Sequence, residues 1–153
     1  MERHGWGVER HYHLDTAWVA TFSHGNGRRV LGVNSEMDAL PGVGHACGHN
    51  LIAIAGVAVA LAAKAALIEH DIPGKVVLLG TPGILYSLFC VHDVQKKTAE
   101  EGGQGKVILL ERGAYKGMDA CVMRVNIPSL YCNHLIKFDA GVILLLVRSA
   151  AQV

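Results

Sequence analysis

The stretch "EMDALPGVGHACGHN", residues 36–50, gathers several side chains that can bind a metal ion. A thiolate at Cys47 and an imidazole at His49 stand two residues apart, so in an irregular loop both can turn toward one ion. Asp38 can orient or brace such a site from the end of a preceding strand. The glycines in this stretch let the backbone fold close to the ion. The stretch therefore predicts one half of a metal site.

A second cluster, "AEEGG", places Glu100 and Glu101 side by side before two glycines. Adjacent carboxylates in a loop permit a division of roles, in which one binds a metal and the other takes a proton from water. Each cluster has an ordinary alternative: Cys47 as a small buried hydrophobe, the loop histidines as hydrogen-bonding groups, and the two glutamates as a charged helix start. The occurrence of both clusters after predicted strand ends favours the functional interpretation.

The elements that would position these residues follow from apolar runs and turn signals. Residues 16–22, "TAWVATF", show partial strand alternation, "GNGRR" is a turn, and residues 30–34, "VLGVN", form a short apolar run. This pattern predicts a hairpin that feeds a strand into the metal-capable loop. Sites in open α/β sheets form at the carboxyl ends of strands, which is where this loop lies.

A long helix is predicted over residues 51–69, with Asn50 as its N-cap. The segment is apolar on nearly all sides, which predicts that it is covered on more than one face. Its alanine content and Lys64 make it a poor membrane span, so we interpret it as a buried helix. Residues 75–82, "KVVLLGTP", have the pattern of a buried parallel strand. Strand, helix and strand together predict a right-handed crossover in an α/β sheet.

The second half of the chain contains three further predicted segments. Residues 103–115 predict a short helix ended by Gly113, and residues 119–125 predict another inner strand. The apolar carboxyl end, residues 141–153, has too few strongly apolar residues for a bilayer and is interpreted as a strand or a disordered tail.

Composition narrows the functional class. The chain has 153 residues and 51% hydrophobic residues, enough for one domain with a packed core. Its 14 Lys and Arg against 13 Asp and Glu leave no basic cluster for a row of phosphates, so we expect no nucleic-acid partner and no membrane partner. The charged amino terminus shows no export signal and the four cysteines show no disulfide spacing, which predicts a cytoplasmic location.

The quoted segments resemble a known family. "MDALPGVGHACGHN", the alanine-rich helix, "VVLLGTP", "AEEGGQGK" and "ERGAYKGMDACVM" are similar to the amidohydrolase and aminoacylase branch of the M20 metallopeptidase family, including its aminobenzoyl-glutamate hydrolase-like members. The resemblance implies an α/β fold: a partial three-layer, zinc-peptidase-like catalytic domain with a mostly parallel sheet, incomplete and without its lid domain. It also implies a dinuclear zinc or manganese site that cleaves amide bonds of N-acyl amino acids or small peptides.

The resemblance also implies a role for each motif residue. Cys47, His49 and Glu101 match metal ligands, and Glu100 matches the general base that activates the attacking water. Asp38 matches an acid that supports the site. A thiolate and imidazole pair favours zinc over manganese.

Two other residues of the motif match positions with no predicted catalytic role. Glu36 stands where other branches of the family place a metal-binding histidine, and in this branch that position need not be a ligand. His45 lies close to the motif and is predicted to be structural.

The chain departs from the family pattern in two places. Residues 83–98, "GILYSLFCVHDVQKKT", separate "GTP" from "AEEGG", which adjoin in the family. After Met123 the expected histidine-bearing segment is missing, and His134 lies at the wrong offset to replace it. We therefore predict a partial catalytic domain over residues 1–124, with 83–98 as a non-family insertion and 125–153 as a divergent tail. We interpret both departures as translated intron or another gene-model error.

Two functions of different class follow from these features. By lineage the chain is a metal-dependent hydrolase of amide bonds, with a small N-acyl amino acid or dipeptide as its substrate. For the 153-residue molecule itself, the departures favour a non-catalytic fragment with at most a single metal site. The complete family enzymes are homodimers, and we expect no homodimer here because the dimerising segment is absent.

Overall fold

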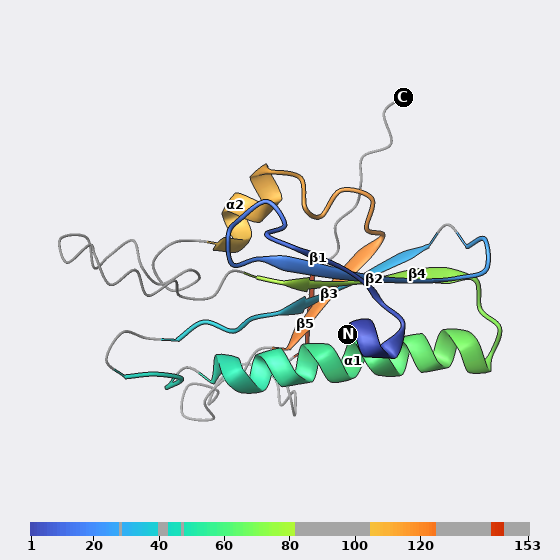
Figure 1. The fold of residues 1–153 in the computed structure, drawn as a ribbon, viewed down its shortest axis with the longest axis horizontal. Coiled ribbons are helices and arrows are strands. Elements are labelled where there is room, and N and C mark those ends of the chain that lie inside the picture. The colour runs from blue at the N-terminus through green and yellow to red at the C-terminus, as the bar shows by residue number, and fades with distance from the viewer. Residues whose placement is uncertain (28, 40–42, 47, 82–104, 125–141, 146–153) are drawn as a thin grey trace, which may run out of the picture.

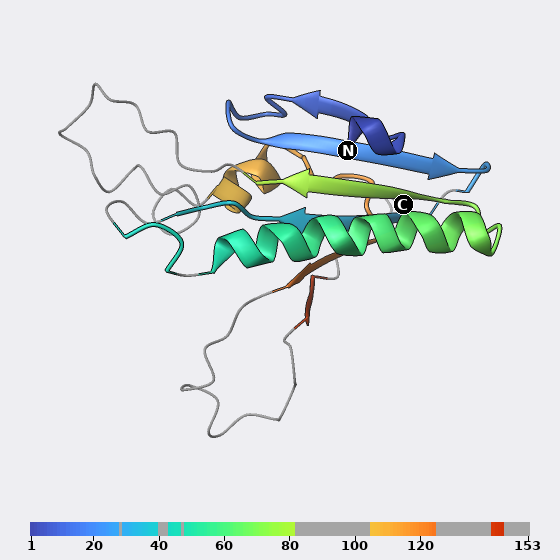
Figure 2. The ribbon, with the colours of Figure 1, turned by 60° about the horizontal axis from the view of Figure 1, so that its bottom comes forward.

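The computed structural model describes residues 1–153 except 28, 40–42, 47, 82–104, 125–141 and 146–153 (Figure 1). Within the described part, six strands form one mixed sheet in the order β1-β2-β4-β3-β5-β6. Figures 1 and 2 show α1 along one face of this sheet and α2 on the other. The elements are η1 (Glu2–His4), β1 (Gly7–Arg10), β2 (Trp18–His24), β3 (Val30–Ser35), α1 (His49–Glu69), β4 (Gly74–Gly80), α2 (Gly105–Glu111), β5 (Ala120–Arg124) and β6 (Val142–Leu145).

The central unit is the crossover β3–α1–β4. β3 and β4 pair in parallel from Val30↔Lys75 to Ser35↔Gly80, and β5 pairs in parallel with the other edge of β3. β4 is buried on both faces: Val76 and Leu78 lie in the core beneath α1, whereas the alternate residues lie in the core on the α2 side. The predicted strand over 75–82 and the crossover between parallel strands are confirmed.

Two predictions about the sheet are wrong. β2 and β3 do not form a hairpin, because β4 lies between them, antiparallel to β2 and parallel to β3. The sheet is also not mostly parallel, since the pairs β1–β2, β2–β4 and β5–β6 are antiparallel. The physical reason is that β4, the most apolar strand, gains most from the centre, and the short β1–β2 connection permits only antiparallel pairing.

The start of α1 also differs from its prediction. The helix begins at His49, and Gly48 is its N-cap in the left-handed conformation with φ of 78°. The N–H groups of Leu51 and Ile52 donate to the Gly48 carbonyl oxygen, at 2.9 and 3.1 Å. Asn50 is therefore the second helical residue, and its prediction as N-cap is wrong because the helical backbone begins one residue earlier.

The coverage of α1 is narrower than predicted. Its buried side includes Ile52, Ala53 and Ala60, whereas Leu51 and Ile54 are 54% and 66% exposed. Within the described residues, coverage on more than one face is therefore wrong. By length and composition, α1 is the one described helix that could cross a membrane. In this fold, its buried side packs on the sheet.

The later elements agree with their predictions where the structure describes them. α2 ends before Gly113, whose φ of 83° and N–H donation to Leu110 close the helix, and β5 confirms the strand predicted over 119–125. β6 pairs antiparallel with β5, which supports the strand alternative for the carboxyl end. The insertion predicted at 83–98 lies outside the described residues.

We predict that Gly56→Ala lowers the free energy of unfolding, although alanine normally favours a helix by about 1 kcal/mol. A Cβ atom at this position would stand 2.6 Å from the backbone oxygen of Asn34, so the helix would be pushed off β3. Overpacking of this kind costs about 1–3 kcal/mol. Urea unfolding measures the change, and the exposed-face control Ala62→Gly should follow helix propensity alone. A more stable Gly56→Ala chain would contradict this packing.

We also predict that Cys121 resists alkylation in the folded chain. Burial raises the pKa of its thiol from the ordinary 9.0 to about 11. Because the unfolded chain loses this proton first, the group's contribution to stability is present below pH 9 and is lost progressively between pH 9 and 11. Iodoacetamide labelling at pH 8, read by peptide mass spectrometry, checks the protection. Rapid labelling of Cys121 without unfolding would show the prediction to be wrong.

Candidate metal centre

The carboxyl ends of β3 and β4 are joined at one edge of the sheet. Ser35 is the last residue of β3, and its carbonyl oxygen accepts a hydrogen bond of 3.0 Å from the N–H of Thr81, directly after β4. Glu36 and Asp38 follow β3 and are 2% and 0% exposed. Buried carboxyl groups are rare because the charged form loses its hydration, so their surroundings must compensate.

Glu36 is compensated by a cation and an imidazole. Its Oε1 accepts a hydrogen bond of 2.5 Å from Nζ of Lys106 in α2, and its Oε2 lies 3.3 Å from Nε2 of His49 at the start of α1. The Glu36 and His49 side chains are 2% and 10% exposed, whereas that of Lys106 is 33% exposed. Three segments far apart in the sequence therefore meet in one largely buried contact.

Local structure explains why these side chains meet. Gly48 turns the chain in the left-handed conformation, which lets α1 begin with His49 beside the strand ends. Lys106 is the second residue of α2, and its Nζ also lies 3.8 Å from Sδ of Met123 in β5. The ammonium group thus reaches Glu36 across the end of the sheet, and its methylene stem lies along apolar surface.

The other predicted site residues are distributed less compactly. Asp38 is fully buried, and its carbonyl oxygen lies 3.0 Å from Nδ1 of His45. Cys47, Glu100 and Glu101 lie outside the described residues. In the part of the chain that the structure describes, no three His, Cys, Asp or Glu side chains gather closely enough to hold a metal ion.

Sequence reasoning missed two residues at this edge. Lys106 ends the motif "AEEGGQGK", and nothing in its immediate sequence shows that it pairs with a glutamate 70 positions earlier. Thr81, in "GTP", is 1% exposed, and its Oγ1 has no hydrogen-bond partner among the described residues. An unpartnered buried hydroxyl beside the strand ends is a polar group available to the site.

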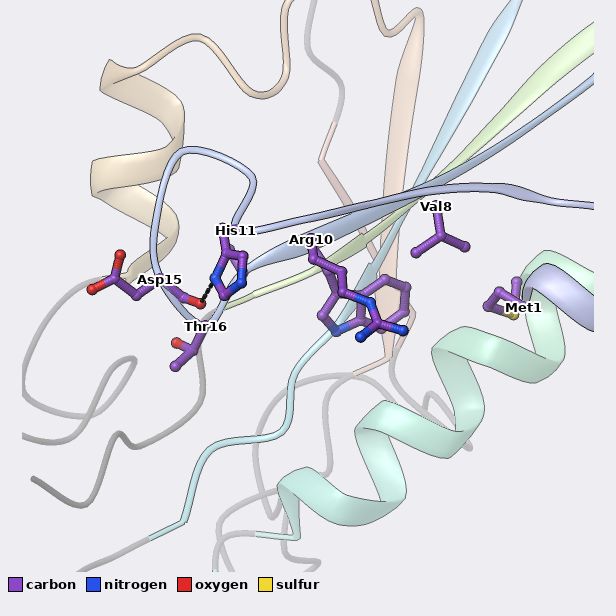
Figure 3. Close-up of a pocket in the computed structure, with 8 residues that line it drawn as sticks. Met1, Val8, Arg10, His11, Asp15 and Thr16 are labelled. Carbon is purple, nitrogen blue, oxygen red and sulfur yellow. Dashed lines mark hydrogen bonds between the residues drawn. The ribbon is translucent and has the colours of Figure 1, made fainter.

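A pocket of about 440 Å³ opens near the same edge, where the β1–β2 connection returns to the sheet (Figure 3). Trp18 pairs with Gly80 in the strand register, and a Cβ atom on Gly80 would stand only 2.1 Å from the indole ring. His11 has φ of 57°, and its Nδ1 lies 2.6 Å from the carbonyl oxygen of Asp15. The pocket is lined by Met1, Val8, Arg10, His11, Asp15, Thr16, Ala17 and Trp18.

Comparison with known proteins gives partial but clear similarity. No family model matches the chain. It is 43% identical over 125 residues to Xaa-Arg dipeptidase of Mus musculus, covering 77% of this chain and 25% of the dipeptidase. The Homo sapiens Xaa-Arg dipeptidase is 41% identical over 129 residues, covering 77% and 26%. One of the subunits of p-aminobenzoyl-glutamate hydrolase from Escherichia coli (strain K12) is 30% identical over 140 residues, covering 80% and 25%.

The chain thus spans about a quarter of the length of these curated relatives. Among solved structures, it resembles a dinuclear metal-binding peptidase of Bacillus subtilis from the M20 family, with a TM-score of 0.53 and 19% identity. That match covers 78% of this chain and 32% of the peptidase. At this level of identity the match shows a shared fold.

We predict that Lys106→Met lowers the free energy of unfolding by about 1–3 kcal/mol, because it leaves the buried Glu36 carboxylate without its cation. The double substitution Glu36→Gln with Lys106→Met should lose less, since no buried charge remains unpaired. Urea unfolding of the single and double variants gives the coupling energy. Lys116→Met, on an exposed lysine, is the matched control and should stay within about 0.5 kcal/mol of the unmodified chain. Equal stabilities for Lys106→Met and Lys116→Met would contradict the ion pair.

Proposed function

The chain is homologous, over 77% of its length, to part of the M20 family of peptidases and amidohydrolases, and from this premise we propose that it contributes to a metal-dependent amide hydrolase. The relatives' names denote hydrolysis of a dipeptide and of an aminobenzoyl-glutamate, both of which contain an amide bond. The observation that carries the proposal is the buried contact of His49 with Glu36 where parallel strands end. We propose N-acyl amino acids or dipeptides as the substrate class.

The described residues fit a metal site in part. His49 offers a buried imidazole that is braced by a carboxylate, as metal-binding histidines commonly are. In the proposal, Cys47 and Glu101 complete the donor set with a thiolate and a carboxylate, and Asp38 supports the site from the end of β3. Sulfur and nitrogen donors favour zinc. A metal ion bound there would polarise the amide carbonyl.

The proton transfers are assigned to Glu100. Its carboxylate takes a proton from the attacking water as the C–O bond forms, and gives a proton to the amine nitrogen as the C–N bond breaks. The products are a carboxylic acid and an amine, so atoms and protons balance. Glu101, directly adjacent, is free for metal binding because neighbouring side chains in a loop can point to different partners.

A non-catalytic metal-binding fragment is the second candidate. Two observations favour it: no group of three donors forms among the described residues, and the chain spans about a quarter of its curated relatives. The 83–98 segment between "GTP" and "AEEGG" would also displace Glu100 from the strand end. A displacement of about 1 Å can reduce a rate by about 100-fold.

Metal stoichiometry and hydrolysis distinguish the two candidates. The purified chain is loaded with zinc, desalted and analysed by elemental mass spectrometry, then assayed with N-acyl amino acids and dipeptides. A dinuclear enzyme, as in the Bacillus subtilis relative, should retain two ions per chain. It should also lose about 100-fold or more of its hydrolysis on Glu100→Gln, with metal retained. A non-catalytic fragment should retain one ion or none and show no hydrolysis before or after the substitution.

The ligand assignment has its own control. Cys47→Ala should lose zinc, whereas Cys90→Ala, which removes a thiol outside the motif, should keep it. Full metal content and full hydrolysis in Cys47→Ala would overturn the assigned metal site. Zinc loss in both variants would show a non-specific thiol effect instead.

A further inference from the structure

We propose that Glu36 and Lys106 are positioning residues that fix the ring of His49, so that its Nε2–H faces Glu36 and its Nδ1 is the nitrogen left for a metal ion. The inference deepens the proposed function and rests on the proposal that His49 is a metal ligand. It rests on two contacts: Lys106 Nζ to Glu36 Oε1 at 2.5 Å, and His49 Nε2 to Glu36 Oε2 at 3.3 Å.

The first step concerns the charge of Glu36. A carboxylate that is 2% exposed is stable in its ionised form only beside a cation, and the Lys106 ammonium group occupies that place at Oε1. The pair carries no net charge, so the strand end tolerates it. An ionised carboxylate can only accept hydrogen bonds, and this fixes what Oε2 can do.

The second step concerns the tautomer of His49. Because Oε2 can only accept, the proton between the two side chains belongs to Nε2 of the imidazole. In the neutral ring the lone pair is then on Nδ1, which is the atom able to bind a cation. The contact therefore selects one of the two nitrogens as well as the orientation of the ring.

The third step concerns where the three residues are anchored. Glu36 follows β3, His49 is the first residue of α1, and Lys106 is in the first turn of α2. The contact thus joins both helix layers to the end of the sheet, so each side chain stands on a regular element or directly beside one. Carboxylates that hold a metal-binding histidine typically contribute 10- to 100-fold in metal affinity, which sets the expected size of the effect.

The first test needs no metal. Long-range proton–nitrogen NMR on the metal-free chain with labelled histidine reports which ring nitrogen carries the proton, and His49→Asn identifies the signal. We expect the Nε2–H tautomer at His49 in the unmodified chain and a mixed tautomer in Glu36→Gln. A protonated Nδ1 with a bare Nε2 in the unmodified chain would overturn the inference.

The second test measures zinc affinity by competition with a chelator. Glu36→Gln and Lys106→Met should each bind zinc about 10- to 100-fold more weakly, and Lys106→Arg, which keeps the charge, should recover most of the affinity. Glu111→Gln, on an exposed glutamate of α2, is the matched control and should bind as the unmodified chain does. If a variant fails to fold, Lys106→Arg and the tautomer of the unmodified chain still decide.

The outcomes separate this inference from the proposed function. If the unmodified chain binds zinc and Glu36→Gln binds it equally well, the positioning role is wrong while the metal site stands. If the unmodified chain binds no zinc, the proposed function fails and the role of His49 as a metal ligand fails with it. The expected tautomer together with weakened zinc binding in Glu36→Gln supports both.

Discussion

The burial of one carboxylate at the end of β3 is the constraint on which the candidate site depends. Glu36 is 2% exposed and is stable there because Lys106 supplies a cation and His49 supplies an imidazole. These partners come from the two helix layers, so neither helix can shift without leaving a buried charge unpaired. The same contact therefore stabilises the layered fold and orients a metal-capable ring.

Close packing between α1 and β3 makes this contact possible. Gly56 lets the helix backbone approach Asn34 and Ser35, and the Ser35 hydroxyl donates to the carbonyl oxygen of Ala53 at 3.1 Å. On the other face, Asn34 exchanges hydrogen bonds with the Tyr115 hydroxyl. β3 is thereby fixed from both sides, and the residues that follow it emerge at a defined place.

Local sequence patterns predicted the elements better than their arrangement. Continuous apolar runs gave β4 and β5, and the strand–helix–strand order gave the parallel crossover, because those signals lie within each segment. The place of β4 between β2 and β3 depends on pairing between distant segments, which no local pattern contains. The partnership of Glu36 with Lys106 was missed for the same reason. Sequence placed His49 and Asp38 correctly beside a strand end, whereas Cys47 lies outside the described residues.

The central claim is that this chain carries part of a metal-dependent amidohydrolase site in which His49 is a ligand. Zinc X-ray absorption spectroscopy of the zinc-loaded chain tests this claim most directly, because it reports the donor atoms themselves. The account predicts sulfur at about 2.3 Å together with imidazole nitrogen at about 2.0–2.1 Å. The sulfur contribution should vanish in Cys47→Ala, and the imidazole contribution should diminish in His49→Asn. A shell of oxygen atoms alone would contradict the account.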